Sequence, residues 1–361
     1  MAAYYGLMAS AAFFGRLYDQ SVNYLFASSG PVRVGGHPIY MIGGKEYKLD
    51  PTDDSLEAAA RLSSEFRSDM DKLPWMTYRS GFQLIPSPQQ FAITDKADPG
   101  SAGASGFMMR KGGSGVTGFT SDSGWGCTLR TTQMMTASAL IRDAKQMNRF
   151  YPDTEASLLS LFSDSFSSPL SIHNMIRQSK GRPGKWFGPS QAGWAMAALA
   201  EPYINTHVAM DGGLSLRKLK NLIKESQDKG LLVYVPVRLA MDTWINVSES
   251  KTAILGLFQQ VHQFIGIVGG DITQSYYFVA ASEDYLYIMD PHTTQAASVQ
   301  VVTADNKNQV VPSQPGIMAM RWPRLTSTMM YGFLLHSEKD LIDLAEAIAK
   351  IGSKIGFVVH K

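Results

Sequence analysis

The hydrophobic positions of this chain follow two periods, one typical of helices and one typical of buried strands. Leu56, Ala59 and Phe66 recur at helical spacing after a Pro-Thr-Asp-Asp segment, which is typical of a helix start. A second helical pattern extends from Met134 to Ala144 at spacings of three and four residues. This second pattern predicts a helix that buries one face.

The C-terminal half contains runs that predict strands. Residues 276–279 and 285–289 flank a short polar turn, which indicates a β-hairpin. Two continuous apolar runs, at 231–236 and 264–268, predict further buried strands, and a helix over 248–260 separates them. Since helices and strands do not alternate regularly, the pattern favours an α+β fold over a doubly wound sheet.

The last helical pattern lies near the C-terminus. Ser337 precedes Asp340 at the spacing of a capping box, and an apolar stripe formed by Leu341, Leu344 and Ile348 follows. We therefore predict a helix that closes the domain.

Composition divides the chain into unequal parts. Residues 1–37 are predicted to form a flexible tail and residues 38–361 a single domain. Within that domain, residues 87–119 are rich in Gly and Ser and lack periodicity, so we predict a flexible insertion. Residues from about 150 to 230 are predicted to form a small auxiliary helical subdomain.

Composition and charge exclude several classes of protein. The chain is 45% hydrophobic and 18% charged, which supplies enough apolar material for a large core. The formal net charge is +2, from 33 basic and 31 acidic residues that are interspersed, so no broad face for nucleic acid is expected. No apolar run is long enough to predict a membrane span. The N-terminus lacks a basic residue before Arg16 and does not resemble a secretory signal.

Cys127 is the single cysteine of the chain, so neither an internal disulfide nor a cysteine-based zinc site can form. This cysteine usage suits a reducing compartment, and we expect a cytoplasmic protein. Among the histidines, His173 and His207 are interpreted as structural. No metal-ligand spacing is shown by His37, His262, His336 and His360. No metal or other cofactor is expected.

Cys127 also occupies a position that suits a nucleophile. It follows Gly124, Trp125 and Gly126 and stands at the start of the second helix. A thiol at a helix N-terminus lies near unpaired backbone N–H groups, which lower its pKa and favour the reactive thiolate. The alternative is a buried cysteine that packs as a small apolar side chain.

Asp290, Pro291 and His292 form a second candidate site, where the predicted hairpin ends. Residues two apart in an extended chain project to the same side, so the carboxylate and the imidazole can lie together. In a cysteine peptidase the imidazole takes the thiol proton and later protonates the leaving amine, while the carboxylate orients the imidazole. The alternative is a turn with a surface histidine.

Two motifs carry these residues. They are Ser-Asp-Ser-Gly-Trp-Gly-Cys-Thr-Leu-Arg-Thr-Thr-Gln-Met, which contains Cys127, and Asp-Pro-His-Thr-Thr-Gln, which begins at Asp290. Together they resemble the signatures of one family, the autophagy cysteine peptidases called Atg4. Further similarity runs in the same order over residues 38–360, at Ile42–Tyr47, Thr77–Arg79, Ser171–His173, Lys185–Ser190, Val235–Leu239 and Ile267–Gly270.

The resemblance implies a papain-like fold and hydrolysis of the peptide bond after a glycine near the C-terminus of an Atg8-type ubiquitin-like protein. The same chemistry would release lipidated Atg8 from phosphatidylethanolamine, with only peripheral membrane contact. Matched residue by residue, Cys127 is the nucleophile, His292 the general base and acid, and Asp290 its orienting partner. Tyr78 would donate its hydroxyl to the oxyanion hole alongside the Cys127 N–H. A core or rim tyrosine is the alternative.

Trp186 resembles the family tryptophan that lies over the nucleophile. An indole there would leave no room for a Cβ substituent, so that only glycine fits beside the cleaved bond. The alternative is a buried tryptophan in a glycine-bounded turn.

The segment that begins with Gly269, Gly270, Asp271 and Ile272 resembles the mobile loop over the same channel. Asp271 and Ile272 stand where many relatives have a proline. Thr131 stands where many relatives have a second cysteine, so an internal disulfide switch is absent here.

We expect the chain to be monomeric. Besides a thiol peptidase, two other functions stay open. A catalytically weak Atg8-binding scaffold would keep the fold, but the complete set of Cys127, Asp290, His292 and Tyr78 argues against it. Another papain-like thiol hydrolase or acyl transferase is disfavoured by the Asp-x-His order. In the tail, Tyr4–Leu7 and Phe14–Leu17 fit an aromatic-x-x-aliphatic pattern of Atg8 interaction.

Overall fold

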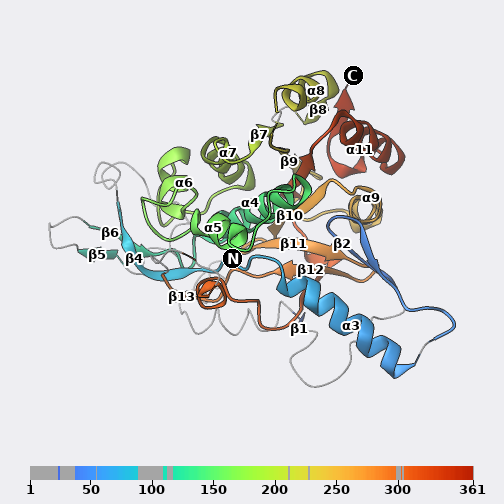
Figure 1. Cartoon of the computed structure of the whole chain (residues 1–361), viewed down its shortest axis with the longest axis horizontal. Coiled ribbons are helices and arrows are strands. Elements are labelled where there is room, and N and C mark those ends of the chain that lie inside the picture. The colour runs from blue at the N-terminus through green and yellow to red at the C-terminus, as the bar shows by residue number, and fades with distance from the viewer. Residues whose placement is uncertain are drawn as a thin grey trace.

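The computed structural model describes residues 37–53, 55–87, 117–209, 212–226, 228–297 and 305–360, together with Val302 and the backbone of residues 23–24 and 109–111. A large sheet with helices packed on both of its faces forms the centre (Figure 1). The predicted α+β class is therefore confirmed.

The large sheet is almost entirely antiparallel. Its strand order is β1 (Asn23–Tyr24), β14 (Met318–Arg321), β12 (Tyr285–Met289), β11 (Ser275–Ala281), β10 (Phe264–Gly270), β15 (Thr328–Leu335), β9 (Leu231–Arg238) and β7 (Asn205–Val208), with β2 (Ile39–Met41) on β11 and β3 (Lys45–Tyr47) on β2. Only β7 and β9 pair in parallel within the described sheet. The predicted strands and the hairpin of β11 and β12 are confirmed.

Two hydrophobic cores lie on opposite faces of this sheet, because successive side chains of a strand alternate between its faces. In β9, Leu232 and Tyr234 belong to one core, while Val233 and Val235 belong to the other. The first core is covered by α4 (Cys127–Gln146) and α7 (Pro189–Ala200), and the second by α9 (Val247–Gln260) and α11 (Glu338–Ile351).

Helix α4 packs against β10 and β11, and the prediction that it buries a single face is wrong. All of its residues except Arg142, Lys145 and Gln146 are buried. Polar side chains are tolerated inside because they bond to the helix itself, as where Thr132 Oγ1 donates to Thr128 O at 2.7 Å. The helix that carries Cys127 is therefore held from every side.

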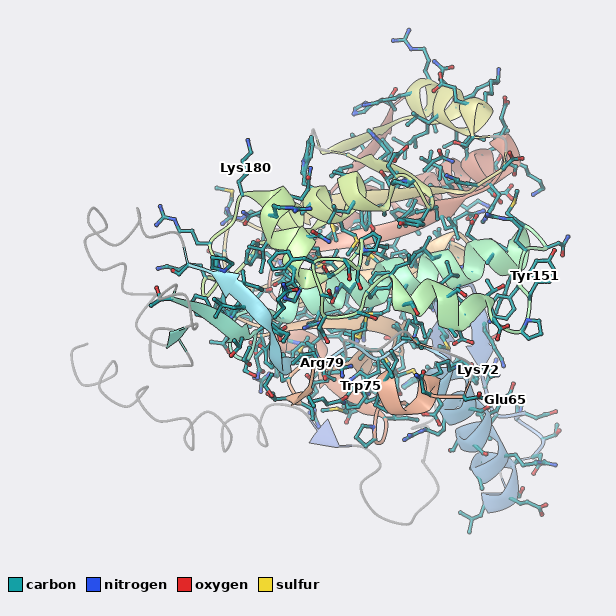
Figure 2. The ribbon with its side chains drawn as sticks, turned by 60° about the vertical axis from the view of Figure 1, so that its left-hand side comes forward. Glu65, Lys72, Trp75, Arg79, Tyr151 and Lys180 are labelled. Atoms are coloured by element: carbon teal, nitrogen blue, oxygen red, sulfur yellow. The ribbon has the colours of Figure 1, made fainter. Side chains whose placement is uncertain are left out.

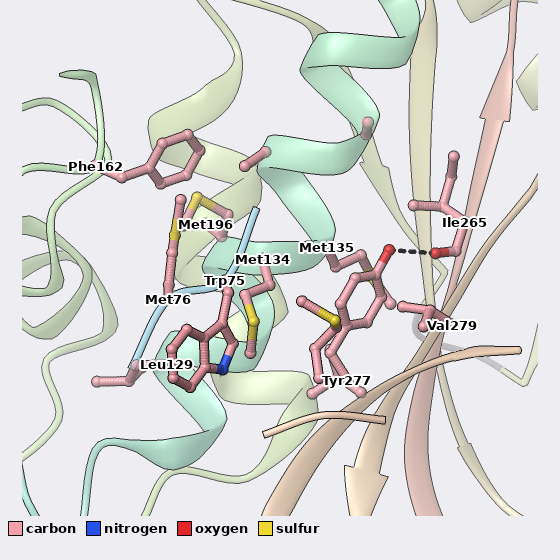
Figure 3. Close-up of a cluster of buried hydrophobic side chains, with 14 of the residues drawn as sticks. Trp75, Met76, Leu129, Met134, Met135, Phe162, Met196, Ile265, Tyr277 and Val279 are labelled. Atoms are coloured by element: carbon pink, nitrogen blue, oxygen red, sulfur yellow. Dashed lines mark hydrogen bonds between the residues drawn. The ribbon is translucent and has the colours of Figure 1, made fainter. Parts of the chain in front are cut away.

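The core beneath α4 is rich in methionine and aromatic side chains. Met134 and Met135 project from α4 toward Trp75 and Tyr277 (Figure 3). The Tyr277 hydroxyl, although buried, donates to Ile265 O at 2.5 Å. This bond gives the buried hydroxyl group a hydrogen-bond partner inside the core.

The remaining helices lie at the periphery. Helix α3 (Leu56–Asp71) begins after Ser55, whose hydroxyl accepts a hydrogen bond from Ala58 N. The capping box predicted for Ser337 and Asp340 is present at the start of α11. None of the helices in the described ranges combines the length and the apolar character that crossing a membrane requires. The other helical segments are α3 (Leu56–Asp71), α5 (Thr154–Ser160), α6 (Ile172–Ser179), α8 (Leu216–Glu225), α10 (Lys307–Val310) and the 3₁₀ turns Trp322–Arg324 and Ser353–Ile355.

A second, smaller sheet projects to one side of the molecule (Figure 1). It consists of β13 (Gln295–Ala296), β4 (Arg79–Pro86), β6 (Thr117–Ser121) and β5 (Met109–Lys111), while β16 (Val358–His360) pairs with β8 (Gly213–Ser215) elsewhere. Strand β5 and most of β6 fall in the range expected to be an insertion. Residues 88–108 and 112–116 lie outside the described residues.

The other domain predictions concern two further ranges. The range 150–230 holds α5 to α8, and it also supplies β7 to the edge of the large sheet. Of the predicted tail, the backbone of β1 pairs with β14, and the segments Tyr4–Leu7 and Phe14–Leu17 lie outside the described residues.

Candidate active site

Cys127 is the first residue of α4, as predicted, and a tight turn places it there. Gly124 has a φ of +81°, a conformation that L side chains rarely adopt. A Cβ on Gly126 would lie 2.4 Å from the carboxylate of Asp122, and Trp125 between the two glycines is buried. The Gly-Trp-Gly sequence therefore shapes the turn that brings the thiol to the helix N-terminus.

Asp290 and His292 follow the end of β12 and lie side by side. His292 Nδ1 is 2.6 Å from Asp290 Oδ1, which also accepts from the His292 backbone N–H at 3.0 Å. Because an ionised carboxylate only accepts, Nδ1 carries a proton and Nε2 is the nitrogen left for the thiol. The expectation that the two side chains meet is confirmed.

Two side chains that the sequence reasoning missed hold the Asp290 backbone. Trp75 Nε1 donates to Asp290 O at 2.6 Å, and Asp290 N donates to Gln314 Oε1 at 2.6 Å. Trp75 and Lys72, both labelled in Figure 2, lie on the same stretch of chain, but Trp75 is buried whereas the Lys72 side chain is exposed. Neither Trp75 nor Gln314 belongs to a motif, so no pattern in the sequence could have identified them.

Tyr78 lies between the cysteine and the histidine segments. Its ring packs edge-to-face on His292 with centroids 5.3 Å apart, and its hydroxyl forms a hydrogen bond with Cys127. Its backbone N–H donates to Pro291 O at 2.8 Å, and its carbonyl accepts from Gln295 N at 2.9 Å. The hydroxyl is thus buried beside the Cys127 thiol.

The electrostatics favour a thiolate and an imidazolium. Burial raises the pKa of Cys127, but the hydrogen bond and charge of His292, with the Ser275 N–H and the Tyr78 hydroxyl, bring it below its usual value. Burial lowers the pKa of His292, but the Asp290 carboxylate and then Cys127 raise it to about 10. Near neutral pH these opposite shifts favour the charged form of both groups.

Trp186 lies over the turn that precedes the nucleophile. Its Nε1 donates to Gly124 O at 2.8 Å, although 54% of the residue is exposed. Trp186 and Cys127 line the same groove, which has a volume of about 400 Å³. The alternative of a buried tryptophan is therefore wrong, because the indole forms one wall of an open groove.

The segment predicted to cover the channel also lines this groove, with Gly269, Gly270, Asp271 and Ile272. It folds as a tight turn, in which Asp271 N donates to Gln274 O at 3.0 Å. A Cβ on Gly270 would collide with the same carbonyl, so the turn requires glycine there. The Asp271 carboxylate binds Thr273 N at 2.9 Å and the Arg324 guanidinium at 3.2 Å. Ile272 is exposed at the tip.

The remaining candidates have structural contacts. Thr131 Oγ1 donates to Cys127 O at 3.0 Å and lies 3.1 Å from Ser275 Oγ. His173 Nε2 is 2.9 Å from Gln83 O, in a buried position that agrees with a structural histidine. Within the described part of the chain, no group of three or more acidic, cysteine or histidine side chains could hold a metal ion.

The sequence of the chain is similar to those of known cysteine proteases. The sequence profile of the Peptidase C54 catalytic domain matches residues 63–347. A protein of Pyricularia oryzae named cysteine protease ATG4 is 36% identical over 254 residues, which are 64% of this chain and 49% of that protein. A probable cysteine protease ATG4 of Phaeosphaeria nodorum is 32% identical over 270 residues, 70% of this chain and 56% of the relative. The chain thus spans about half the length of these two relatives.

Proposed function

The chain belongs to the peptidase C54 family of papain-like cysteine peptidases, and from this premise we propose that it cleaves Atg8-type ubiquitin-like proteins after a glycine near their C-terminus. The observation that carries the proposal is the hydrogen-bonded series of Cys127, His292 and Asp290, in which Cys127 also lines the groove. We propose that the same site releases lipidated Atg8 from phosphatidylethanolamine in the cytoplasm.

The chemistry follows from the residue positions. The Cys127 thiolate attacks the carbonyl carbon of the glycine, and the developing oxyanion accepts hydrogen bonds from the Tyr78 hydroxyl and the Cys127 N–H. The His292 imidazolium donates its Nε2 proton to the amine as the carbon–nitrogen bond breaks, which leaves a thioester. Water then attacks the thioester, His292 accepts its proton, and the thiolate leaves. The leaving amine is a peptide amine in the precursor and the ethanolamine amine in the lipidated form.

The groove suits a narrow substrate segment. Trp186 and the Gly269–Ile272 turn line the same groove as Cys127. A glycine beside the cleaved bond fits because it has no Cβ to meet these walls. The same walls would reject larger residues at that position.

The test is cleavage of an Atg8-type precursor that carries residues beyond its glycine, read by intact mass. The wild-type chain should remove the extension, and Cys127→Ala should not. Thr131→Val is a matched control, because it alters a buried side chain one helical turn beyond Cys127 without removing the thiol. Binding without cleavage by the wild type would instead identify a scaffold. Cleavage of unrelated peptides at non-glycine sites would identify a different thiol hydrolase.

A further inference from the structure

A cluster of four buried charged side chains lies next to the proposed site. Asp122, Arg130 and Asp164 are almost completely buried, and Arg79 is 6% exposed. Arg130 joins the two acids: its Nε donates to Asp122 Oδ2 at 2.8 Å, and its terminal nitrogen lies 2.9 Å from Asp164 Oδ1. None of these residues has a role in the chemistry proposed above.

A buried ion pair alone is weak support for stability, because desolvation of the two charges offsets their attraction. Well-packed apolar side chains of the same volume would stabilise the fold about as much as the ion pair does. Stability alone therefore does not explain why charged side chains are buried around Asp122.

Asp122 connects the two segments that carry Cys127 and Tyr78. It lies in the short connection between β6 and α4, and its carbonyl accepts from the backbone N–H of Gly126 at 2.8 Å. Its Oδ1 accepts from the backbone N–H of Arg79 at 2.6 Å, and its own N–H donates to Arg79 O at 3.2 Å. One residue thus bonds on one side to the turn of the nucleophile and on the other to the residue after Tyr78.

Arg130 fixes the carboxylate of Asp122 in this arrangement. It lies on the first turn of α4, and its backbone N–H donates to Gly126 O at 3.0 Å. Its terminal nitrogen also reaches Asp122 Oδ1 at 3.3 Å, so both carboxylate oxygens are engaged from the helix that begins with Cys127. Rotation of the carboxylate away from Arg79 would break these bonds as well.

We propose that Asp122, clamped by Arg130, is a positioning residue that fixes the Tyr78 hydroxyl relative to Cys127 for stabilisation of the oxyanion. The inference rests on the proposed peptidase function. Asp122 does not touch the substrate, and it acts through the backbone of Arg79 and therefore through Tyr78.

The test is a double-mutant cycle of Asp122→Asn with Tyr78→Phe, measured as kcat and KM on the Atg8-type precursor. Removal of a preorganised oxyanion donor lowers kcat by roughly 10²- to 10³-fold, so Asp122→Asn should cost at least about tenfold in kcat. KM should stay within about threefold, because the groove itself is unchanged. In the Tyr78→Phe background, Asp122→Asn should cost less than about threefold more, since the hydroxyl to be positioned is already absent.

Asp164→Asn is the matched control. Asp164 is equally buried and binds the same Arg130, but the bonds to the Arg79 backbone come from Asp122. Asp164→Asn should lower the thermal unfolding temperature about as much as Asp122→Asn does while leaving kcat within about threefold of wild type. Alkylation of Cys127 by iodoacetamide needs the thiolate but no oxyanion donor, so Asp122→Asn should change its rate no more than Tyr78→Phe does.

An additive cycle, or an equal loss of kcat in Asp164→Asn, would overturn the inference. If Asp122→Asn does not fold, Arg130→Lys replaces it in the cycle, because lysine keeps the charge but loses the fork that holds both oxygens. Failure of both variants to fold would make the cluster a folding determinant and would also overturn the inference. If the wild type cleaves the precursor and the cycle is additive, only this inference is refuted. If the wild type does not cleave the precursor, both the proposed function and this inference are refuted.

Discussion

Replacement of Asp290 by asparagine should narrow the pH range of the proposed peptidase activity at both its acidic and its basic end. The substitution keeps the shape of the side chain and removes the charge that lies 2.6 Å from His292 Nδ1. Without that charge, the imidazolium is less stable, and the Cys127 thiolate loses part of its charged partner. The basic limb of the pH profile should then move down and the acidic limb should move up.

The structure sets the size of this effect. Burial lowers the His292 pKa, yet Asp290 and Cys127 raise it from 6.5 to about 10, with Asp290 the larger of the two sources. Opposite charges about 4 Å apart at an effective dielectric constant near 20 attract by about 4 kcal/mol. At about 1.4 kcal/mol for each pH unit, loss of the Asp290 charge should bring the basic limb down by about 2 to 3 pH units.

The assay is kcat/KM on the Atg8-type precursor between about pH 5 and 11. This range includes the basic limb of the wild type, which is expected near pH 10. At neutral pH the variant should lose activity by up to roughly 10⁴-fold, as when an orienting carboxylate is removed from a triad. The rate of Cys127 alkylation over the same range reports the thiolate without any substrate. Circular dichroism at each pH separates unfolding from titration. A basic limb that stays near pH 10 in Asp290→Asn would refute the reasoning.

Two further predictions concern specificity and stability. Trp186→Ala should reduce the preference for glycine over alanine before the cleaved bond by at least about tenfold, measured as the ratio of kcat/KM on matched precursors, because the indole wall is removed. The free energy of unfolding should change by about 1 kcal/mol or less, since the side chain is half exposed, and an unchanged ratio would exclude Trp186 as the wall. Ser337→Ala removes the capping box of α11 and should cost about 1 kcal/mol in urea denaturation with kcat/KM unchanged. A loss of activity there would contradict a purely structural cap.

The strands and helices with strong patterns could be predicted, because each buries apolar side chains at one clear period. Helix α4 shows where the pattern misleads. Thr132, Gln133 and Thr136 suggest a solvent face, yet they are buried. Thr136 Oγ1 donates to Thr132 O at 2.7 Å, and Gln133 Nε2 donates to Leu170 O at 2.8 Å. A hydropathy pattern counts such residues as exposed because it cannot see the bonds that satisfy them.

The candidate site divides in the same way. Cys127, Asp290 and His292 were identifiable because their chemistry is rare and their neighbours form motifs. Trp75 and Gln314 were not, since their contribution is one hydrogen bond each to the Asp290 backbone, from segments distant in the sequence. Such contacts depend on the packing of whole elements rather than on any local pattern.

The short segment around Tyr78 explains how parts so far apart in the chain are brought together. Its N–H and carbonyl bond to Pro291 and Gln295 on the histidine side, and the next residue, Arg79, bonds to Asp122 on the cysteine side. Backbone bonds of this kind depend little on side-chain identity, so they leave no strong signal in the sequence. The position of the Tyr78 hydroxyl therefore depends on bonds to both the cysteine side and the histidine side of the site. Loss of the bond between Asp122 and Arg79 should therefore displace the hydroxyl of Tyr78, whereas a change in the cap of α11 should alter stability alone.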